Sequence, residues 1–218
     1  MFKLKTDNSL EGKEFFVTSA VALTCLILSF AFPGQNGFQG LTGGLFFFVI
    51  IPILYIKLVL KKKITDFGWN VQRKNEGLFW GISMLLITLL SFFILLRFTS
   101  FGENYSVPAY AVNSFWLFFI YEIIFVNFFV FFQEFFFRGF ILFYLIPKIS
   151  YGAIVLQFFL GVAGLFLAGS LNWQFIPALI ISLTSGIIAY KSRSFIYSYV
   201  VAFLSFLILD SFLIYNLK

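Results

Sequence analysis

The chain has 218 residues, of which 61% are hydrophobic and only 11% are charged. This composition, with a mean hydropathy of +0.99, excludes an ordinary soluble domain and indicates an all-α, polytopic membrane protein. The formal net charge of +6 does not indicate a nucleic-acid partner, because the lysines and arginines lie between apolar stretches, where they set topology.

The N-terminal part predicts two transmembrane helices. Residues 1–14 are polar and form a predicted cytoplasmic segment, and residues 15–60 hold apolar stretches at about 15–32 and 41–60. The first stretch is too long for the apolar core of a cleavable signal peptide, so we expect it to be retained as a helix. Pro52 is expected to kink the second helix.

Residues 61–76 are the most basic segment and begin with three consecutive lysines. Positive charge collects on the cytoplasmic side of membrane proteins, so we expect this loop to lie inside. The run Asp66-Phe67-Gly68-Trp69 predicts a turn with its aromatic rings at the membrane interface. The remaining residues, 77–218, predict five more helices, at about 77–96, 113–149, 151–168, 175–190 and 195–215.

These seven predicted helices place the N-terminus inside and the C-terminus outside. All of the 15 lysines and arginines then lie in or beside inside loops, except Arg97, Arg138 and Lys218. This distribution favours an integral protein of a bacterial cytoplasmic (inner) membrane. In the fifth helix, the small residues Gly161, Gly164 and Ala168 predict a smooth strip for close helix contact.

The stretch 113–149 is apolar except for a few polar side chains, which are Glu122, Asn127, Gln133, Glu134 and Arg138. Ionised groups at the membrane centre cost about 2.5–3.5 kcal/mol each, so these residues are functional candidates that should face protein or water. Helical periodicity places Asn127, Glu134 and Arg138 on one face, with Glu122 and Gln133 about a quarter-turn away. Residues 140–146 either lie along the interface or prolong the helix.

The run Gln133-Glu134-Phe135-Phe136-Phe137-Arg138-Gly139 resembles the first motif of the CPBP family, which comprises CAAX proteases and bacteriocin-processing enzymes. That motif reads Glu-Glu-x-x-x-Arg and is usually followed by glycine. The order of the surrounding parts is also similar over roughly residues 60–212. The resemblance implies a CPBP-like intramembrane fold in which Glu134 is the catalytic base and Arg138 orients it. Gln133 departs from the family's first glutamate.

The resemblance also implies two histidine-bearing motifs that this chain lacks. The histidine of the second motif is expected at Ala163, Gly164 or Leu165, and the histidine and asparagine of the third at Ala202 and Phe206. The whole sequence contains no histidine, which removes the commonest general base and metal ligand. We therefore predict no metal site and no cofactor.

The leading hypothesis is a pseudoenzyme in which Glu134 and Arg138 form a structural ion pair. Such a protein acts by binding, as an accessory subunit of a membrane protein complex or as an immunity-like or chaperone-like factor. Its expected partners are the lipid bilayer and other integral membrane proteins or membrane-bound peptides.

Two alternatives stay open. One is a glutamate-dependent intramembrane endopeptidase in which Glu134 activates water, helped by Asp210 of the seventh helix. Under the pseudoenzyme hypothesis and under this endopeptidase alternative, Glu122 and Asn127 serve as structural polar contacts. The other alternative, a small transporter or channel, rests only on the polar groups of the fourth helix and lacks the inverted repeats often found in transporters.

Overall fold

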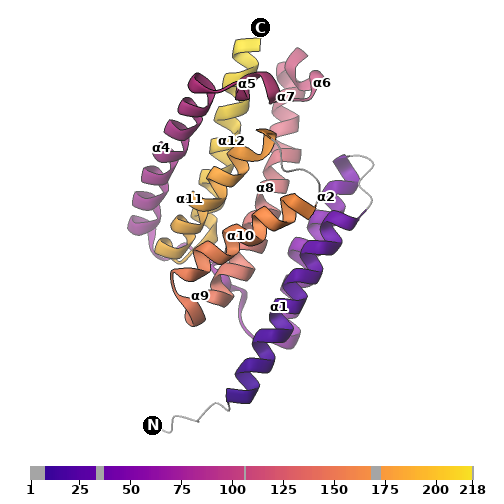
Figure 1. The fold of residues 1–218 in the computed structure, drawn as a ribbon, viewed down its shortest axis with the longest axis vertical. Coiled ribbons are helices and arrows are strands. Elements are labelled where there is room, and N and C mark those ends of the chain that lie inside the picture. Colours follow the sequence, from indigo (N-terminus) through magenta and orange to yellow (C-terminus); the bar gives the residue numbers. More distant parts are fainter. Residues whose placement is uncertain (1–7, 33–36, 106, 168–172, 218) are drawn as a thin grey trace.

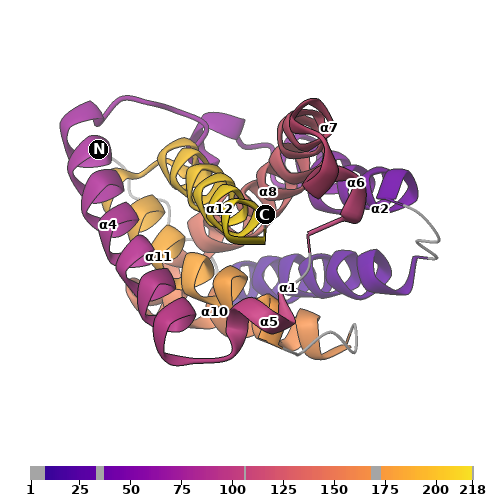
Figure 2. The same ribbon diagram turned by 90° about the horizontal axis from the view of Figure 1, so that it is seen from above.

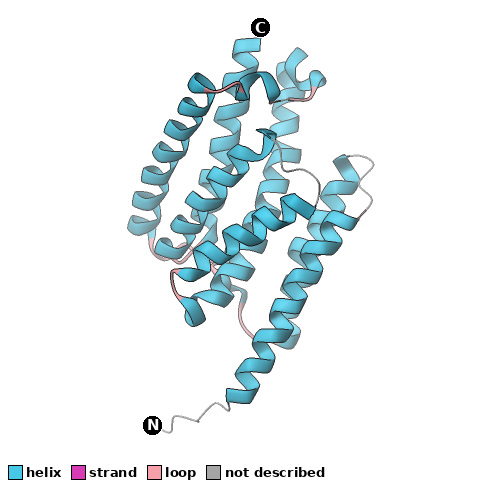
Figure 3. Ribbon diagram, in the orientation of Figure 1, coloured by secondary structure: helices cyan, strands magenta, loops and turns pink. Residues whose placement is uncertain are grey.

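The computed structural model describes residues 8–32, 37–105, 107–167 and 173–217, and every regular element in these ranges is a helix (Figure 3). Residues 1–7 of the predicted cytoplasmic segment and Ala168 of the predicted strip lie outside the described residues. The helices have these bounds: α1 Asn8–Ala31, α2 Gly37–Leu45, η1 Phe46–Ile50, α3 Ile51–Leu54, η2 Tyr55–Val59, η3 Ile64–Phe67, α4 Lys74–Phe98, α5 Phe101–Asn104, α6 Ala109–Asn113, α7 Phe115–Ile120, η4 Tyr121–Val126, α8 Asn127–Glu134, η5 Phe135–Leu142, α9 Phe143–Ile149, α10 Gly152–Leu167, η6 Trp173–Phe175, α11 Ile176–Ser192 and α12 Phe195–Leu217.

Five helices in the described ranges are long and apolar enough to cross a membrane, and their bounds are Gly12–Ala31, Gly37–Val59, Lys74–Phe98, Phe115–Ile149 and Phe195–Tyr215. They coincide with five of the predicted spans. The predicted fifth and sixth spans are also helical, as α10 and α11, but these helices have 16 and 17 residues. At 1.5 Å per residue they extend about 25 Å, less than the roughly 30 Å of a typical hydrocarbon core.

The helices form one bundle around the continuous helix that runs from Phe115 to Ile149 (Figures 1 and 2). On one side of it, α4, α11 and α12 pack against one another, and α12 also packs against α8. On the other side lie α1 and the helix 37–59, while α10 crosses obliquely and contacts both α1 and α11. The start of α1 and the end of α12 lie at opposite ends of the molecule (Figure 1).

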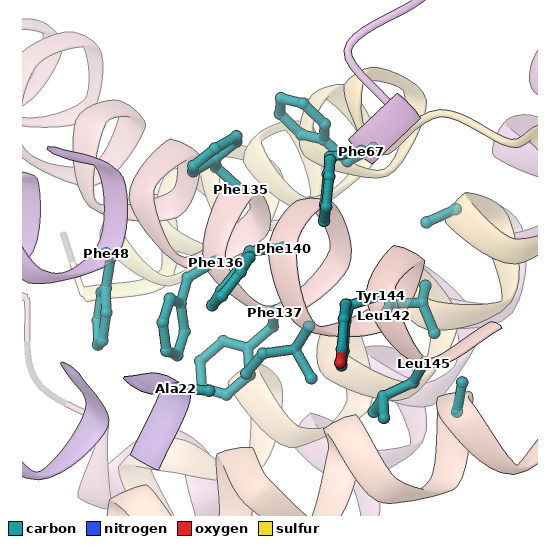
Figure 4. Packing of buried hydrophobic residues seen from close by; sticks show 14 of the residues in the cluster. Ala22, Phe48, Phe67, Phe135, Phe136, Phe137, Phe140, Leu142, Tyr144 and Leu145 are labelled. Atoms are coloured by element: carbon teal, nitrogen blue, oxygen red, sulfur yellow. The ribbon is translucent and has the colours of Figure 1, made fainter. Parts of the chain in front are cut away.

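The central helix supplies the core of the bundle. All eight residues of η5 are buried, so neighbouring helices cover this segment on every side. Its aromatic rings pack against several elements: Phe136 lies 4.6 Å from Phe48 of η1, and Phe140 lies 6.0 Å from Tyr55 of η2 between ring centroids (Figure 4). Residues 140–146 prolong the helix, which was one of the two predicted possibilities.

The helix 37–59 changes type around Pro52 instead of ending there. Proline lacks the backbone N–H that an α-helix needs, and its ring crowds the preceding turn. Here the short α3 segment that contains Pro52 lies between the π-helical segments η1 and η2. The wider turns on both sides carry the helix past the proline.

The basic loop folds back onto the bundle through the predicted turn. Gly68 has a φ of 79°, in the left-handed region that glycine adopts without strain. Its carbonyl oxygen accepts a hydrogen bond from the backbone N–H of Phe195 at 3.2 Å. The next residue, Trp69, packs edge-on against Phe135 and Phe195, with centroid distances of 5.9 and 5.5 Å. The loop therefore connects the core helix to the start of α12.

Candidate functional site

A cavity of about 600 Å³ lies between the helices at the predicted site residues. Gln133, Glu134, Arg138 and Asp210 all line it, together with side chains from α2, α10 and α11. Most of the remaining lining is aliphatic or aromatic. We call this space the Glu134 cavity.

Glu134 and Arg138 form a buried ion pair at the junction of α8 and η5. Their positions, four residues apart, place both side chains on the same helix face, and Arg138 Nη1 lies 3.4 Å from Glu134 Oε1. Glu134 is 2% exposed and Arg138 is 3% exposed. Arg138 Nε is buried without a hydrogen-bond partner. The charge of the pair is thus compensated, but one guanidinium donor remains unused.

The second oxygen of Glu134 is bound by α12. The hydroxyl of Ser198 donates to Glu134 Oε2 at 2.7 Å, and Ser185 of α11 lies close to the same carboxylate without a regular hydrogen bond. Sequence reasoning did not identify Ser198. It lies one turn before Ala202, so the helical periodicity of α12 was a usable signal.

A second group of polar residues surrounds Asp210. The hydroxyl of Tyr105 donates to Asp210 Oδ1 at 2.8 Å. Glu122 of η4 is 0% exposed and lies beside Asp210. Neither of the two carboxyl oxygens of Glu122 has a regular hydrogen bond. Burial and the nearby charge of Asp210 raise the pKa of Tyr105, which lies in the loop before the central helix, above its ordinary value.

The structure does not bring Glu134 and Asp210 together. Glu134 contacts α12 at Ser198, and 12 residues separate Ser198 from Asp210, a distance of about 18 Å along the helix. Because α12 runs antiparallel to the central helix, Asp210 is level with Glu122 instead. The two carboxyl groups share the cavity as separate sites, so the predicted Glu134–Asp210 pair has no geometric basis.

The other predicted residues have distinct positions. Gln133 is half-buried and lines the Glu134 cavity. Asn127 accepts a hydrogen bond from the Tyr199 hydroxyl at 2.5 Å, which joins α8 to α12.

Only some of the positions that the CPBP resemblance assigns to histidine and asparagine line the Glu134 cavity. Leu165, Ala202 and Phe206 line the Glu134 cavity. Ala163 is exposed, and Gly164 packs close to the Phe30 ring of α1. Of the three candidates in α10, Leu165 is therefore the one that faces Glu134's cavity.

The buried charges define what the site is able to do. Within the described ranges, no three His, Cys, Asp or Glu side chains come together in a metal-binding group. Among the described residues, three carboxyl groups and one guanidinium are buried, so full ionisation would give these buried groups a net charge of −2. Two adjacent carboxylates repel strongly in a low dielectric, so Glu122 and Asp210 require a shared proton or a cation.

The chain has no significant match among protein-family models, curated proteins or solved structures. The CPBP resemblance consequently depends on the motif residues and their order.

Proposed function

We propose that this chain is a divergent, non-hydrolytic member of the CPBP family that binds a segment of another membrane protein, or a membrane-bound peptide, in the Glu134 cavity. The observation that carries this proposal is the state of Glu134, whose oxygens are engaged by Arg138 and Ser198. The residues facing the same space at the assigned histidine and asparagine positions are leucine, alanine and phenylalanine.

The same geometry argues against hydrolysis. A general base must take a proton from the attacking water, and an oxyanion needs donors placed where its charge develops. Leu165, Ala202 and Phe206 have side chains that neither donate nor accept hydrogen bonds. With no histidine in the sequence, Glu134 has no imidazole partner that would share the proton transfer.

The cavity is suited to a peptide ligand. Its volume of about 600 Å³ falls within the range of small-molecule sites, and its walls are mainly apolar with a few polar groups. Arg138 and the half-buried Gln133 both line this cavity, and the two side chains carry N–H donors. Backbone carbonyls of a bound segment would accept hydrogen bonds from such donors. An acyl chain has no such acceptor along its length.

The proposal includes the membrane arrangement. We propose that α10 and α11 complete two short crossings, which gives seven membrane segments with a CPBP-like topology. The basic loop 61–76 then faces the cytoplasm of a bacterial cell. The bound segment belongs to a protein of the same membrane, which makes this chain an accessory or immunity-like factor.

Photocrosslinking in native membranes tests the binding function. A photoreactive residue at Leu165, in the cavity, is expected to give adducts of discrete, protein-sized mass. The matched control is the same residue at Phe93 of α4, which is 61% exposed on the outside of the bundle. Equal adduct patterns from the two positions, or no protein adduct from position 165, would overturn the proposal.

The endopeptidase hypothesis retains one supporting observation, which is that Glu134 lines an internal cavity. Purified protein is therefore to be incubated with a CAAX-type peptide beside the Glu134→Gln variant. We expect no cleavage by either protein. Cleavage by the unmodified protein that the Gln substitution abolishes would establish hydrolysis and reject the pseudoenzyme proposal.

A further inference from the structure

A second, smaller cavity lies beside the core helix, between α1, α9 and α10. It has a volume of about 190 Å³ and is lined almost entirely by apolar side chains. Phe15, Leu23 and Leu156 line it and are between 40% and 46% exposed, so the cavity opens as a groove on the outside of the bundle. We call it the α1 groove, and it is separate from the Glu134 cavity.

Two polar side chains are buried in the wall of this groove. The Thr18 hydroxyl donates to the carbonyl oxygen of Glu14 and contacts the Tyr55 hydroxyl, so it is satisfied. Tyr144 of α9 is 6% exposed, and its hydroxyl lies beside Thr18 and Glu14 without a regular hydrogen bond. Figure 4 shows Tyr144 and its chain neighbour Leu145, both of which line the groove. A buried hydroxyl without a partner is unfavourable, so a ligand that supplies an acceptor would stabilise this site.

Two lysines are held at one end of the groove by its aromatic rings. Lys148 Nζ lies 5.0 Å from the Tyr144 ring centroid and 5.5 Å from that of Phe15. Lys62 Nζ lies 5.9 Å from the Tyr144 centroid and 3.5 Å from the carboxylate of Glu14. Glu14 offsets one of these positive charges, and the neighbouring Lys61 and Lys63 add two more. This end of the groove is therefore basic.

We propose that the α1 groove binds an anionic phospholipid, with an acyl chain along its apolar wall and the phosphate between Lys62 and Lys148. Charge complementarity selects this occupant, because basic pockets between membrane helices bind anionic headgroups. The Tyr144 hydroxyl donates to a phosphate or ester oxygen. The basic end of the groove matches an anionic headgroup, and its apolar wall matches an acyl chain.

Native mass spectrometry of the delipidated full-length protein tests the site, with phosphatidylglycerol and phosphatidylcholine of identical chains as probes. We expect tighter binding of phosphatidylglycerol. Lys62→Gln and Lys148→Gln should each weaken it about five-fold, since each lysine near an anionic lipid contributes about a five-fold effect. Tyr144→Phe, which keeps the ring, should weaken it about ten-fold through the lost hydrogen bond.

The matched control is Lys191→Gln. Lys191 Nζ lies 5.1 Å from the Trp80 centroid and 5.4 Å from that of Tyr151, so its charge and its aromatic contacts resemble those of Lys148 at a place away from the groove. Equal affinity for the two lipids, an equal loss in the Lys191→Gln variant, or displacement of the lipid by inorganic phosphate would overturn the proposal. An unchanged phosphatidylglycerol affinity in Tyr144→Phe would also overturn it, because that variant keeps every packing contact of the ring.

Discussion

Arg138 compensates only one of the three carboxyl groups that the described helices bury. Its guanidinium is 3.4 Å from Glu134, whereas no lysine or arginine in the described part of the chain pairs with Glu122 or Asp210. Removing one partner of a buried ion pair leaves an uncompensated charge, which is strongly destabilising. Glu122 and Asp210 share a proton or a cation instead of pairing with a basic side chain, so replacing Glu122 by its neutral amide breaks no ion pair. The two sites should therefore differ in how strongly they respond to neutralisation.

Glu134→Gln is expected to lower the free energy of unfolding by about 3–5 kcal/mol, because it leaves the Arg138 charge buried without its partner. Glu122→Gln is its matched control, since it makes the same chemical change on the same helix at a fully buried residue without an ion pair. We expect that variant to stay close to the unmodified protein in stability. Denaturant titration in detergent micelles measures both, and equal destabilisation would contradict the assignment of Arg138 to Glu134 alone.

Tyr105→Phe should destabilise the protein by about 1.5–3 kcal/mol at neutral pH, because it removes the hydroxyl that donates to Asp210. The pKa of Tyr105 is raised in the folded state, so its contribution to stability is complete below the unfolded-state pKa of about 10 and decreases as the pH rises above that value. The difference in melting temperature between the two proteins should therefore shrink above about pH 10. Tyr110→Phe, at a 52% exposed position, is the control and should show neither effect. A constant difference across pH would contradict the proposed contact.

These residue contacts differ in how far the sequence predicted them. The Glu134–Arg138 pair follows from helical spacing, because residues four apart share a face. The Tyr105–Asp210 bond joins residues 105 positions apart, and no periodicity relates a loop to a distant helix. Periodicity also predicts the face of Asp210 but not its depth along a neighbouring helix. For this reason periodicity alone left open a Glu134–Asp210 pair, as in the endopeptidase alternative, that the depth of Asp210 along α12 does not provide.

At the scale of elements, long apolar stretches predicted where helices form, but not which of them are buried. A helix that is apolar all round has the same composition in lipid as in a protein core. Residues 135–142 are completely enclosed, whereas Leu86 and Leu90 of α4 are exposed, although both segments are rich in large apolar side chains. Burial is decided by which helices pack together, and apolar composition alone does not show that.

The turn at Gly68 holds the basic loop in its position on the bundle. A residue with a side chain at a φ of 79° is strained, and its Cβ would also collide with the ring of Phe143. We expect Gly68→Ala to destabilise the protein by about 1–3 kcal/mol and to release the loop from α12. Faster trypsin cleavage at Lys61–Lys63 would report that release.

Gly12→Ala is the control for the Gly68→Ala substitution. A methyl group at position 12, within α1, meets no atom within 4 Å, and alanine favours a helix over glycine by up to about 1 kcal/mol. The Gly12 variant should therefore keep the cleavage rate of the unmodified protein. An unaltered cleavage rate in Gly68→Ala as well would show that the loop is not held by this turn.

At the scale of the molecule, the basic segments predicted to face inside meet at one end of the bundle. Lys62 and Lys148 both lie over the ring of Tyr144, and the side chain of Asn70 donates to the carbonyl of Arg193 at 3.1 Å. The charge distribution of the sequence therefore predicted which loops are neighbours. It did not predict the lengths of α10 and α11, which are shorter than the hydrocarbon core of a membrane is thick. Helix ends depend on packing as well as on composition.

The proposed orientation is testable by cysteine labelling, because the natural Cys25 is 2% exposed and should remain silent. Lys63 and Glu103 are both exposed and lie in loops that the charge distribution assigns to opposite sides of the membrane. In intact cells, a membrane-impermeant maleimide should label Glu103→Cys, and Lys63→Cys should react only after the membrane is permeabilised. If both positions react in intact cells, the loops 61–76 and 99–114 lie on the same side. The helix Lys74–Phe98 between them would then not cross the bilayer, and the cytoplasmic position proposed for the basic end of the α1 groove would be wrong.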